Sequence, residues 1–198
     1  MQPATRSTLV STAFLCMLVS AAPAAYGQAA TEQAVLDSLR SALKKYEDPV
    51  VAIHDGYFST LGCVTIGRAG AAGEVPYKVG GMGVHFLNVQ AIGPVASPDH
   101  PQVLIYEPNG DKLRLVAAEW FIPLATGVKE RPALLGHPFD GPMMGHHPLM
   151  PAQMTHWDLH VWLYKPNPLG MFAPTNPNIK CTGYSYAMVE EPPKLVTP

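Results

Sequence analysis

The chain has 198 residues, which is enough for one domain with a hydrophobic core but too few for two ordinary domains. Charged residues make up only 14% and the formal net charge is -2, so the sequence lacks the basic surface typical of nucleic-acid-binding proteins. No run of like charge marks a segment that would bind a membrane surface. The 21 prolines and 17 glycines favour short elements joined by many turns.

Residues 1–27 have the pattern of a secretory signal peptide. Arg6 supplies the positive start, residues 9–19 form an apolar stretch, and Ala25-Tyr26-Gly27 matches the small-x-small cleavage pattern. The apolar stretch is too short to span a bilayer. A lipoprotein signal is disfavoured because a leucine, not a small residue, precedes Cys16. We therefore expect an exported protein, periplasmic or secreted, that has no membrane span after signal cleavage.

Cleavage at this place leaves two cysteines, Cys63 and Cys181. In an oxidising compartment such a pair favours one disulfide, with two free thiols as the alternative. The bridge would tie the start of the domain to its end. In the chain-entropy model it would contribute up to about 4–5 kcal/mol to stability.

Two helices are predicted next. Apolar residues spaced by three and four predict the first helix within Thr31–Glu47. These residues are Val35, Leu36, Leu39, Leu43 and Tyr46. Asp48-Pro49 is typical of an N-cap followed by proline at the first helical position, so a second short helix is expected over Pro49–His54.

The rest of the chain has the pattern of strands and turns. Short strands are expected at Cys63–Ile66, in the second half of Gly80–Asn88, at Asp158–Tyr164 and at Cys181–Val189. The clearest hairpin pairs Val103–Glu107 with Leu113–Phe121 through Asn109-Gly110. We expect a single α+β domain over residues 28–189, in which N-terminal helices pack on a mainly antiparallel sheet, and a disordered tail over residues 190–198.

The second strand of this hairpin is apolar on both faces, as in a central strand. Simple alternation places Leu113, Leu115, Ala117, Glu119 and Phe121 on one face. A carboxylate on such a face is costly unless it is paired or protonated. Glu119 therefore needs a partner.

His85, Glu119 and His160 are the leading candidates for a metal site, since each would point inward from a separate strand. Two histidines and one carboxylate are a common ligand set for a divalent metal such as Zn, Fe or Cu. The competing interpretation is a buried polar network in a non-enzymatic binding or interaction protein. The favoured partner is a metal ion or a small molecule.

A loop rich in methionine and histidine supports an alternative copper site. Residues 141–156 contain Met143, Met144, His146, His147, Met150, Met154 and His156. Thioether sulfur suits Cu(I), and imidazole suits both oxidation states of copper. The predicted ligands are His146, Met150, Met154 and His156. The other interpretation is that the methionines pack as adaptable apolar anchors.

Two further classes of function lack support. Alternation also places His156, Asp158 and His160 on one face, so the aspartate could orient an imidazole. A serine hydrolase would need a nucleophile such as Ser59 or Thr60, but the chain has no G-x-S-x-G motif. No nucleotide cofactor is expected, because Gly80–Gly83 precedes a strand and lacks the lysine of a phosphate-binding loop.

Several motifs resemble a group of uncharacterised, secreted bacterial proteins. They are Lys45-Tyr46, Asp55-Gly56-Tyr57 with Cys63, Gly81–Phe86 (GMGVHF), Leu104–Val116 (with YEPNGDKLRLV), Asp158–Leu163 (DLHVWL), Asn167-Pro168 and Gly170–Ala173 (GMFA). The resemblance covers nearly the whole mature chain and implies one secreted domain, without an established activity. Relatives often have tyrosine in place of Phe86 and Trp120. Val103–Trp120 also resembles, over this short stretch only, the central hairpin of plant oil-body-associated proteins.

Overall fold

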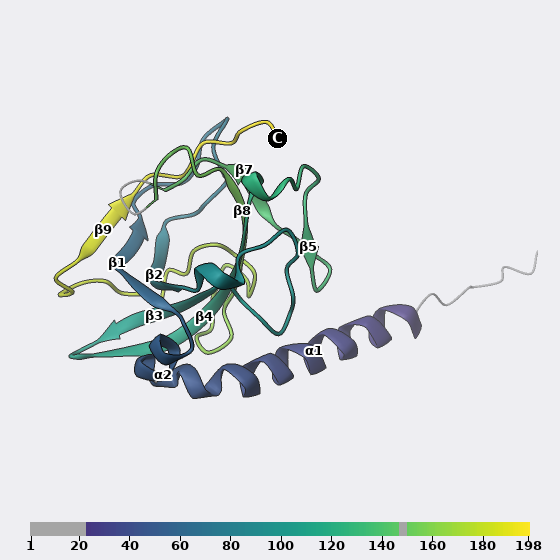
Figure 1. The fold of residues 1–198 in the computed structure, drawn as a ribbon, viewed down its shortest axis with the longest axis horizontal. Coiled ribbons are helices and arrows are strands. Elements are labelled where there is room, and N and C mark those ends of the chain that lie inside the picture. The colour runs from purple at the N-terminus through teal and green to yellow at the C-terminus, as the bar shows by residue number, and fades with distance from the viewer. Residues whose placement is uncertain (1–22, 147–149) are drawn as a thin grey trace, which may run out of the picture.

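The computed structural model describes residues 23–146 and 150–198. It forms a curled sheet with the N-terminal helices against one side, while the C-terminal segment ends near the opposite edge (Figure 1). The predicted signal peptide lies outside the described residues up to position 22, and its last residues, 23–27, begin the first helix. None of the described helices is long and apolar enough to cross a membrane.

The N-terminal helices follow the predicted pattern. The helix α1 spans Pro23–Leu43, the 3-10 turn η1 spans Lys44–Glu47, and α2 spans Pro49–His54. Their buried side chains include Leu36, Leu39, Leu43 and Tyr46. The Asp48 carboxylate accepts a hydrogen bond from the amide of Val50 at 2.9 Å, which confirms the N-cap. The helical face thus packs on the sheet through the residues that its periodicity selected.

The main sheet has seven strands in the order β7-β8-β4-β3-β2-β1-β9. They are β1 (Phe58–Ile66), β2 (Gly80–Leu87), β3 (Val103–Asn109), β4 (Lys112–Pro123), β7 (Asp140–Met143), β8 (His156–Val161) and β9 (Ala187–Glu190). Neighbouring strands are antiparallel except β1 and β9, which are parallel. Two short strands, β5 (Ala133–Leu134) and β6 (His137–Pro138), form a separate hairpin. The predicted α+β class is confirmed.

Short 3-10 turns, η2 (Val89–Ala91) and η3 (Leu124–Thr126), follow β2 and β4. The long segment after β4 shows no regular hydrophobic pattern in the sequence. In the structure it contains η3, the β5-β6 hairpin and the edge strand β7.

The β3-β4 hairpin forms as predicted, but β4 contains a bulge that simple alternation does not anticipate. Ile105 lies opposite Ala117 while Tyr106 lies opposite Leu115, so Val116 is the extra residue. A bulge of this kind shifts the alternation by one position. Leu115 consequently packs with Trp120 in the core that the α1 side chains Leu36 and Leu39 also enter, which we call the helix-side core. The prediction that Leu115 shares a face with Glu119 is therefore wrong.

Two predicted strands have different bounds in the structure. β8 begins and ends earlier than predicted, and Tyr164 lies beyond it, where its hydroxyl donates to the Arg40 carbonyl of α1 at 2.7 Å. The last strand is limited to Ala187–Glu190, because Cys181 and Tyr184 form a turn. The sheet therefore ends in a short parallel strand.

The C-terminal segment differs from the expected disordered tail, because it hydrogen-bonds both to the loop between β1 and β2 and to the edge strand β7. The amide of Val75 donates to the Pro193 carbonyl, and the amide of Leu195 donates to the Gly73 carbonyl, each at 2.9 Å. On the other side, the amide of Val196 donates to the Pro142 carbonyl of β7 at 2.9 Å. Backbone hydrogen bonds of residues 193–196 thus fasten the loop between β1 and β2 to the edge strand β7.

The predicted disulfide is present. Cys63 and Cys181 are bonded, with a sequence separation of 118 residues and a Cα–Cα distance of 5.6 Å. Both cysteines are buried in the helix-side core. The bridge holds the segment before β9 against β1, and a disulfide is consistent with an oxidising, extracytoplasmic compartment.

Candidate metal centre

Three side chains from the strands converge on one point. His85 comes from β2, Glu119 from β4 and His160 from β8. Glu119 and His160 lie directly opposite each other across the β4-β8 pairing. We call these three residues the strand triad. One ligand atom from each lies within 4.8 Å of the other two.

The distances in the strand triad fit one ion. The Nε2 atoms of His85 and His160 lie 3.4 Å and 3.6 Å from the same carboxylate oxygen, Oε2 of Glu119. An ion with bonds of about 2.0–2.2 Å in tetrahedral geometry keeps its ligand atoms about 3.3–3.6 Å apart. Each imidazole nitrogen therefore lies at the distance from the carboxylate oxygen that two ligands of one cation have, and one ligand atom of each residue lies within 4.8 Å of the other two.

Burial controls the charge of the strand triad. It raises the pKa of Glu119 to about 8 and lowers the pKa of His85 to about 4. Burial also lowers the pKa of His160 well below its ordinary value, and the nearby His85 adds to this. At neutral pH, without a cation, the triad holds a mostly protonated carboxyl and two neutral imidazoles. Neutral imidazole nitrogens have lone pairs to offer a metal.

Several polar atoms of the strand triad are buried without a hydrogen bond. Among the described residues, neither ring nitrogen of His160 has a partner, and Oε2 of Glu119 has none. His160 is fully buried. Buried polar atoms in native proteins are nearly always paired, because an unpaired one costs about 1–3 kcal/mol. Among the described residues, these atoms are therefore left for a further partner, such as a cation, to satisfy.

A second cluster lies beside the first. His156 and Asp158 project from β8, and His146 belongs to the loop after β7. Their ligand atoms also lie within 4.8 Å of one another, and we call them the loop triad. The Nε2 atom of His156 is 3.9 Å from Oδ2 of Asp158. The described residues therefore contain two triads that can each hold a metal ion.

The side chains of the loop triad contact polar groups around them. The carbonyl of Met154 accepts from Nδ1 of His156 at 3.0 Å, and the Tyr77 hydroxyl donates to Oδ2 of Asp158 at 3.0 Å. Oε2 of Glu190 lies 3.4 Å from Nδ1 of His146. Outer contacts of this kind orient metal ligands in proteins.

Burial also sets the charge of the loop triad. It lowers the pKa of His146 to about 4 and the pKa of His156 to about 3. Burial raises the pKa of Asp158 well above its ordinary value, and the carboxyls of Glu119 and Asp140 add to this. The loop triad therefore resembles the strand triad in offering neutral imidazoles at neutral pH.

A cavity of about 260 Å³ connects the two triads. His85, Glu119 and all of the loop triad line it, whereas His160 is fully buried and is not one of its lining residues. The rest of the lining is mostly apolar and includes Phe58, Val64, Met82, Leu87, Val89, Ile92, Val103, Phe121, Met150 and Met154. An ion in either triad would therefore face an apolar space that can admit a small molecule.

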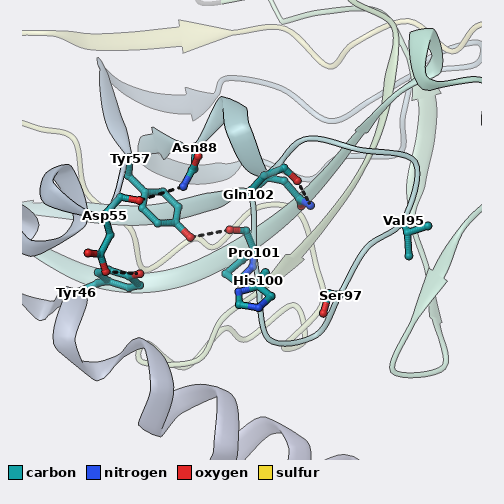
Figure 2. Close-up of a pocket in the computed structure, with 10 residues that line it drawn as sticks. Tyr46, Asp55, Tyr57, Asn88, Val95, Ser97, His100, Pro101 and Gln102 are labelled. Atoms are coloured by element: carbon teal, nitrogen blue, oxygen red, sulfur yellow. Dashed lines mark hydrogen bonds between the residues drawn. The ribbon is translucent and has the colours of Figure 1, made fainter.

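A larger cavity of about 590 Å³ lies on another part of the molecule, near α2 and η2 (Figure 2). Several of its polar groups are already hydrogen-bonded to neighbouring protein groups. The Tyr57 hydroxyl donates to the Pro101 carbonyl at 2.8 Å, and the Tyr46 hydroxyl donates to the Asp55 carboxylate at 3.0 Å. His100 is its single histidine. This cavity brings no ligand set together and is a weaker candidate site.

Of the four predicted copper ligands, the two histidines converge in one cluster and the two methionines only line the adjoining cavity. It brings His146 and His156 together with Asp158, and Met150 and Met154 line the same cavity. The sulfur that touches an imidazole belongs to another residue, because Met143 Sδ lies 3.3 Å from Nε2 of His146. His147 lies outside the described residues.

Sequence reasoning missed Tyr77 and Glu190. Tyr77 lies in the long loop between β1 and β2, and Glu190 ends β9. Neither residue belongs to a motif, so no local signal could have connected them with β8. The curl of the sheet brings both of them to the loop triad.

No family model, curated protein or solved structure matches the chain. What the protein does is therefore inferred from the geometry of the two triads.

Proposed function

We propose that this protein is an exported metal-binding protein that holds one divalent ion between His85, Glu119 and His160. The observation that carries the proposal is the approach of both imidazole Nε2 atoms to one carboxylate oxygen, at 3.4 Å and 3.6 Å. All three ligands stand on strands of one sheet, and Glu119 and His160 are direct cross-strand neighbours. The fold therefore holds the ligand set ready before an ion arrives.

The unpaired atoms favour a metal over a structural network. A network would leave both nitrogens of His160 and Oε2 of Glu119 without hydrogen bonds, at a cost in stability. A cation would satisfy the ligand atoms directly and favour the ionised carboxylate. Both effects make the free energy of metal binding more favourable.

The donor set indicates the class of ion. Two imidazoles and one carboxylate are nitrogen and oxygen donors, which zinc and iron accept readily. His85 and Glu119 line the cavity, so the remaining coordination position faces the space in which a small molecule would sit. The same arrangement is found in catalytic metal centres, which keep an open position. We propose metal binding and assign no reaction.

The rival proposal is an exported interaction protein whose histidines and glutamate only stabilise the sheet. In that case His85, Glu119 and His160 would bind no metal ion, and a partner protein would bind elsewhere on the surface. The two proposals predict opposite results when metal is added.

Metal analysis of protein purified without a histidine tag separates them. After chelation, the protein is mixed with Zn(II), Fe(II) or Cu(II) and bound metal is counted. We expect at least about one Zn or Fe per chain, and a loss of affinity of about 100-fold or more in Glu119→Gln. Glu107→Gln is the matched control, because this buried glutamate of β3 pairs with Arg114 and Lys165, away from the cavity.

The control variant should retain the affinity of the wild type for metal. Less than about 0.1 metal per chain with every ion would overturn the proposal and favour the interaction protein. Equal binding by wild type and Glu119→Gln would place the ion elsewhere.

A further inference from the structure

We propose that His146, His156 and Asp158, together with the sulfur of Met143, form a second metal site that takes copper. This site shares no ligand with the strand triad, and it does not depend on the function proposed above. It opens on the same cavity, which its three triad residues line.

The orientation of His156 is the first argument. Its Nδ1 atom is 3.0 Å from the carbonyl oxygen of Met154, and a carbonyl can only accept. The proton of the neutral ring is therefore on Nδ1, and the lone pair is on Nε2. That nitrogen is the one that faces Oδ2 of Asp158, at 3.9 Å. The backbone thus selects the tautomer that can bind a metal.

Asp158 is the second argument. The Tyr77 hydroxyl holds one carboxylate oxygen, Oδ2, at 3.0 Å. The other, Oδ1, is buried and has no hydrogen-bond partner among the described residues. A cation would satisfy this unpaired oxygen of a fully buried carboxyl group, which lies beside two imidazoles.

The third argument is the sulfur, which distinguishes this site from the strand triad. Met143 Sδ lies 3.3 Å from Nε2 of His146, and the Tyr77 hydroxyl that holds Asp158 also contacts the sulfur at 3.5 Å. The hydroxyl therefore places the thioether and the carboxylate on the same side of the cluster. Thioethers select Cu(I) over harder ions, and imidazole accepts copper in both oxidation states.

Two more thioethers lie on the approach to this cluster. Met150 and Met154 line the cavity, and the side chain of Met154 is exposed at its rim. These sulfurs can hand a cuprous ion from solvent to the buried site, because each offers weak soft coordination. The strand triad, by contrast, consists of two imidazoles and one carboxylate and includes no sulfur ligand.

Competition for Cu(I) tests the proposal. Chelated protein is titrated anaerobically with Cu(I) against bicinchoninate, in the wild type, Met143→Leu, His146→Gln and Glu119→Gln. We expect one tightly held Cu(I) per chain, about 100-fold weaker binding in His146→Gln and about tenfold weaker binding in Met143→Leu. Glu107→Gln, titrated alongside as the control away from the cavity, should keep wild-type Cu(I) affinity, and Glu119→Gln should still bind one Cu(I) per chain. X-ray absorption should show copper–sulfur scattering that Met143→Leu removes.

Other outcomes would overturn the second site. Wild-type Cu(I) affinity in both Met143→Leu and His146→Gln would place copper elsewhere. Loss of Cu(I) in Glu119→Gln would show that one ion bridges the two triads or that only one site exists. Circular dichroism of each variant checks that it is folded. A failure of zinc binding in the wild type with intact Cu(I) binding would reject the proposed function and leave this inference standing.

Discussion

The strand triad takes each of its ligands from a strand of the sheet, whereas the loop triad takes two from β8 and one from the loop that follows β7. Described contacts orient the loop triad: a carbonyl holds His156 and a tyrosine holds Asp158. Both nitrogens of His160 lack such contacts. The comparison contrasts ligands that all stand on strands of one sheet with ligands that hydrogen bonds around the side chain also orient.

The largest expected difference is in the pH dependence of stability. Burial raises the pKa of Glu119 from 4.5 to about 8, so the folded chain keeps a proton that the unfolded chain releases. The contribution of Glu119 is complete below about pH 4.5 and is lost as the pH rises toward about 8. Glu119→Gln cannot ionise, so the metal-free variant should gain a few kcal/mol over wild type across this range. Urea unfolding with chelator at several pH values measures the gain.

Glu107→Gln provides a control of opposite sign. Burial favours the protonated form of Glu107, but hydrogen bonds from Lys165 and Arg114 outweigh it and lower the pKa. Its contribution is therefore present above the ordinary pKa and is lost as the pH falls. Glu107→Gln should be less stable than wild type at neutral pH and approach it in acid. Parallel pH curves for Glu119→Gln and wild type would contradict the raised pKa.

The next largest effect is an opposite change in stability when each of the two histidines of β8 is replaced by leucine. In metal-free protein, His160→Leu should raise the free energy of unfolding by about 1–2 kcal/mol, because it removes two unpaired buried nitrogens and keeps an apolar side chain. His156→Leu removes a hydrogen bond to Met154 and leaves its carbonyl unpaired, so it should lower stability by about 1–2 kcal/mol. Denaturant unfolding with chelator measures both. Equal destabilisation would mean that His160 has a hydrogen-bond partner in solution.

Proton release on binding gives a smaller but direct signal. Zinc bound by the strand triad at pH 7 should displace about one proton, which comes from Glu119. His85 should release none, because burial has already lowered its pKa to about 4. Titration calorimetry in two buffers with different ionisation enthalpies counts the protons. A value near zero would show that the carboxyl is already ionised before zinc binds.

The smallest expected effect concerns the rim of the cavity. Met154→Leu should change the Cu(I) affinity by no more than about threefold, because Met154 serves access rather than the buried site. The comparison with Met143→Leu uses the same substitution at two depths, so volume and hydrophobicity are matched. Chelator competition measures both. A larger loss of affinity in Met154→Leu would indicate that the sulfur ligand is Met154 of the loop and not Met143 of β7.

Local patterns were sufficient for much of the fold. Asp48-Pro49 predicted a helix start, Asn109-Gly110 predicted a hairpin, and two cysteines predicted their disulfide. The first two predictions depend only on neighbouring residues. The disulfide prediction depends on the presence of just two cysteines after signal cleavage. The face of Leu115 was predicted wrongly, because a bulge depends on how two strands fit and not on the pattern of one.

The candidate sites were predicted in part. His85, Glu119 and His160 were selected because polar residues on apolar strands require partners, and the structure brings their ligand atoms within 4.8 Å of one another. Density of His and Met residues in the loop indicated copper ligands. It did not indicate which sulfur meets His146, because Met143 lies on β7 and reaches the imidazole through local folding of the loop.

Sequence by itself determined the α+β class, the identity of most elements, the disulfide and the kinds of ligands that the protein offers. These follow from periodicity, turn chemistry and the cost of burying polar groups. Only the tertiary structure decided which ligands meet. The order of the strands placed β8 beside β4, and the curl of the sheet brought Tyr77 and Glu190 to the loop triad. Such convergence depends on distances between segments remote in the chain, which no local pattern encodes.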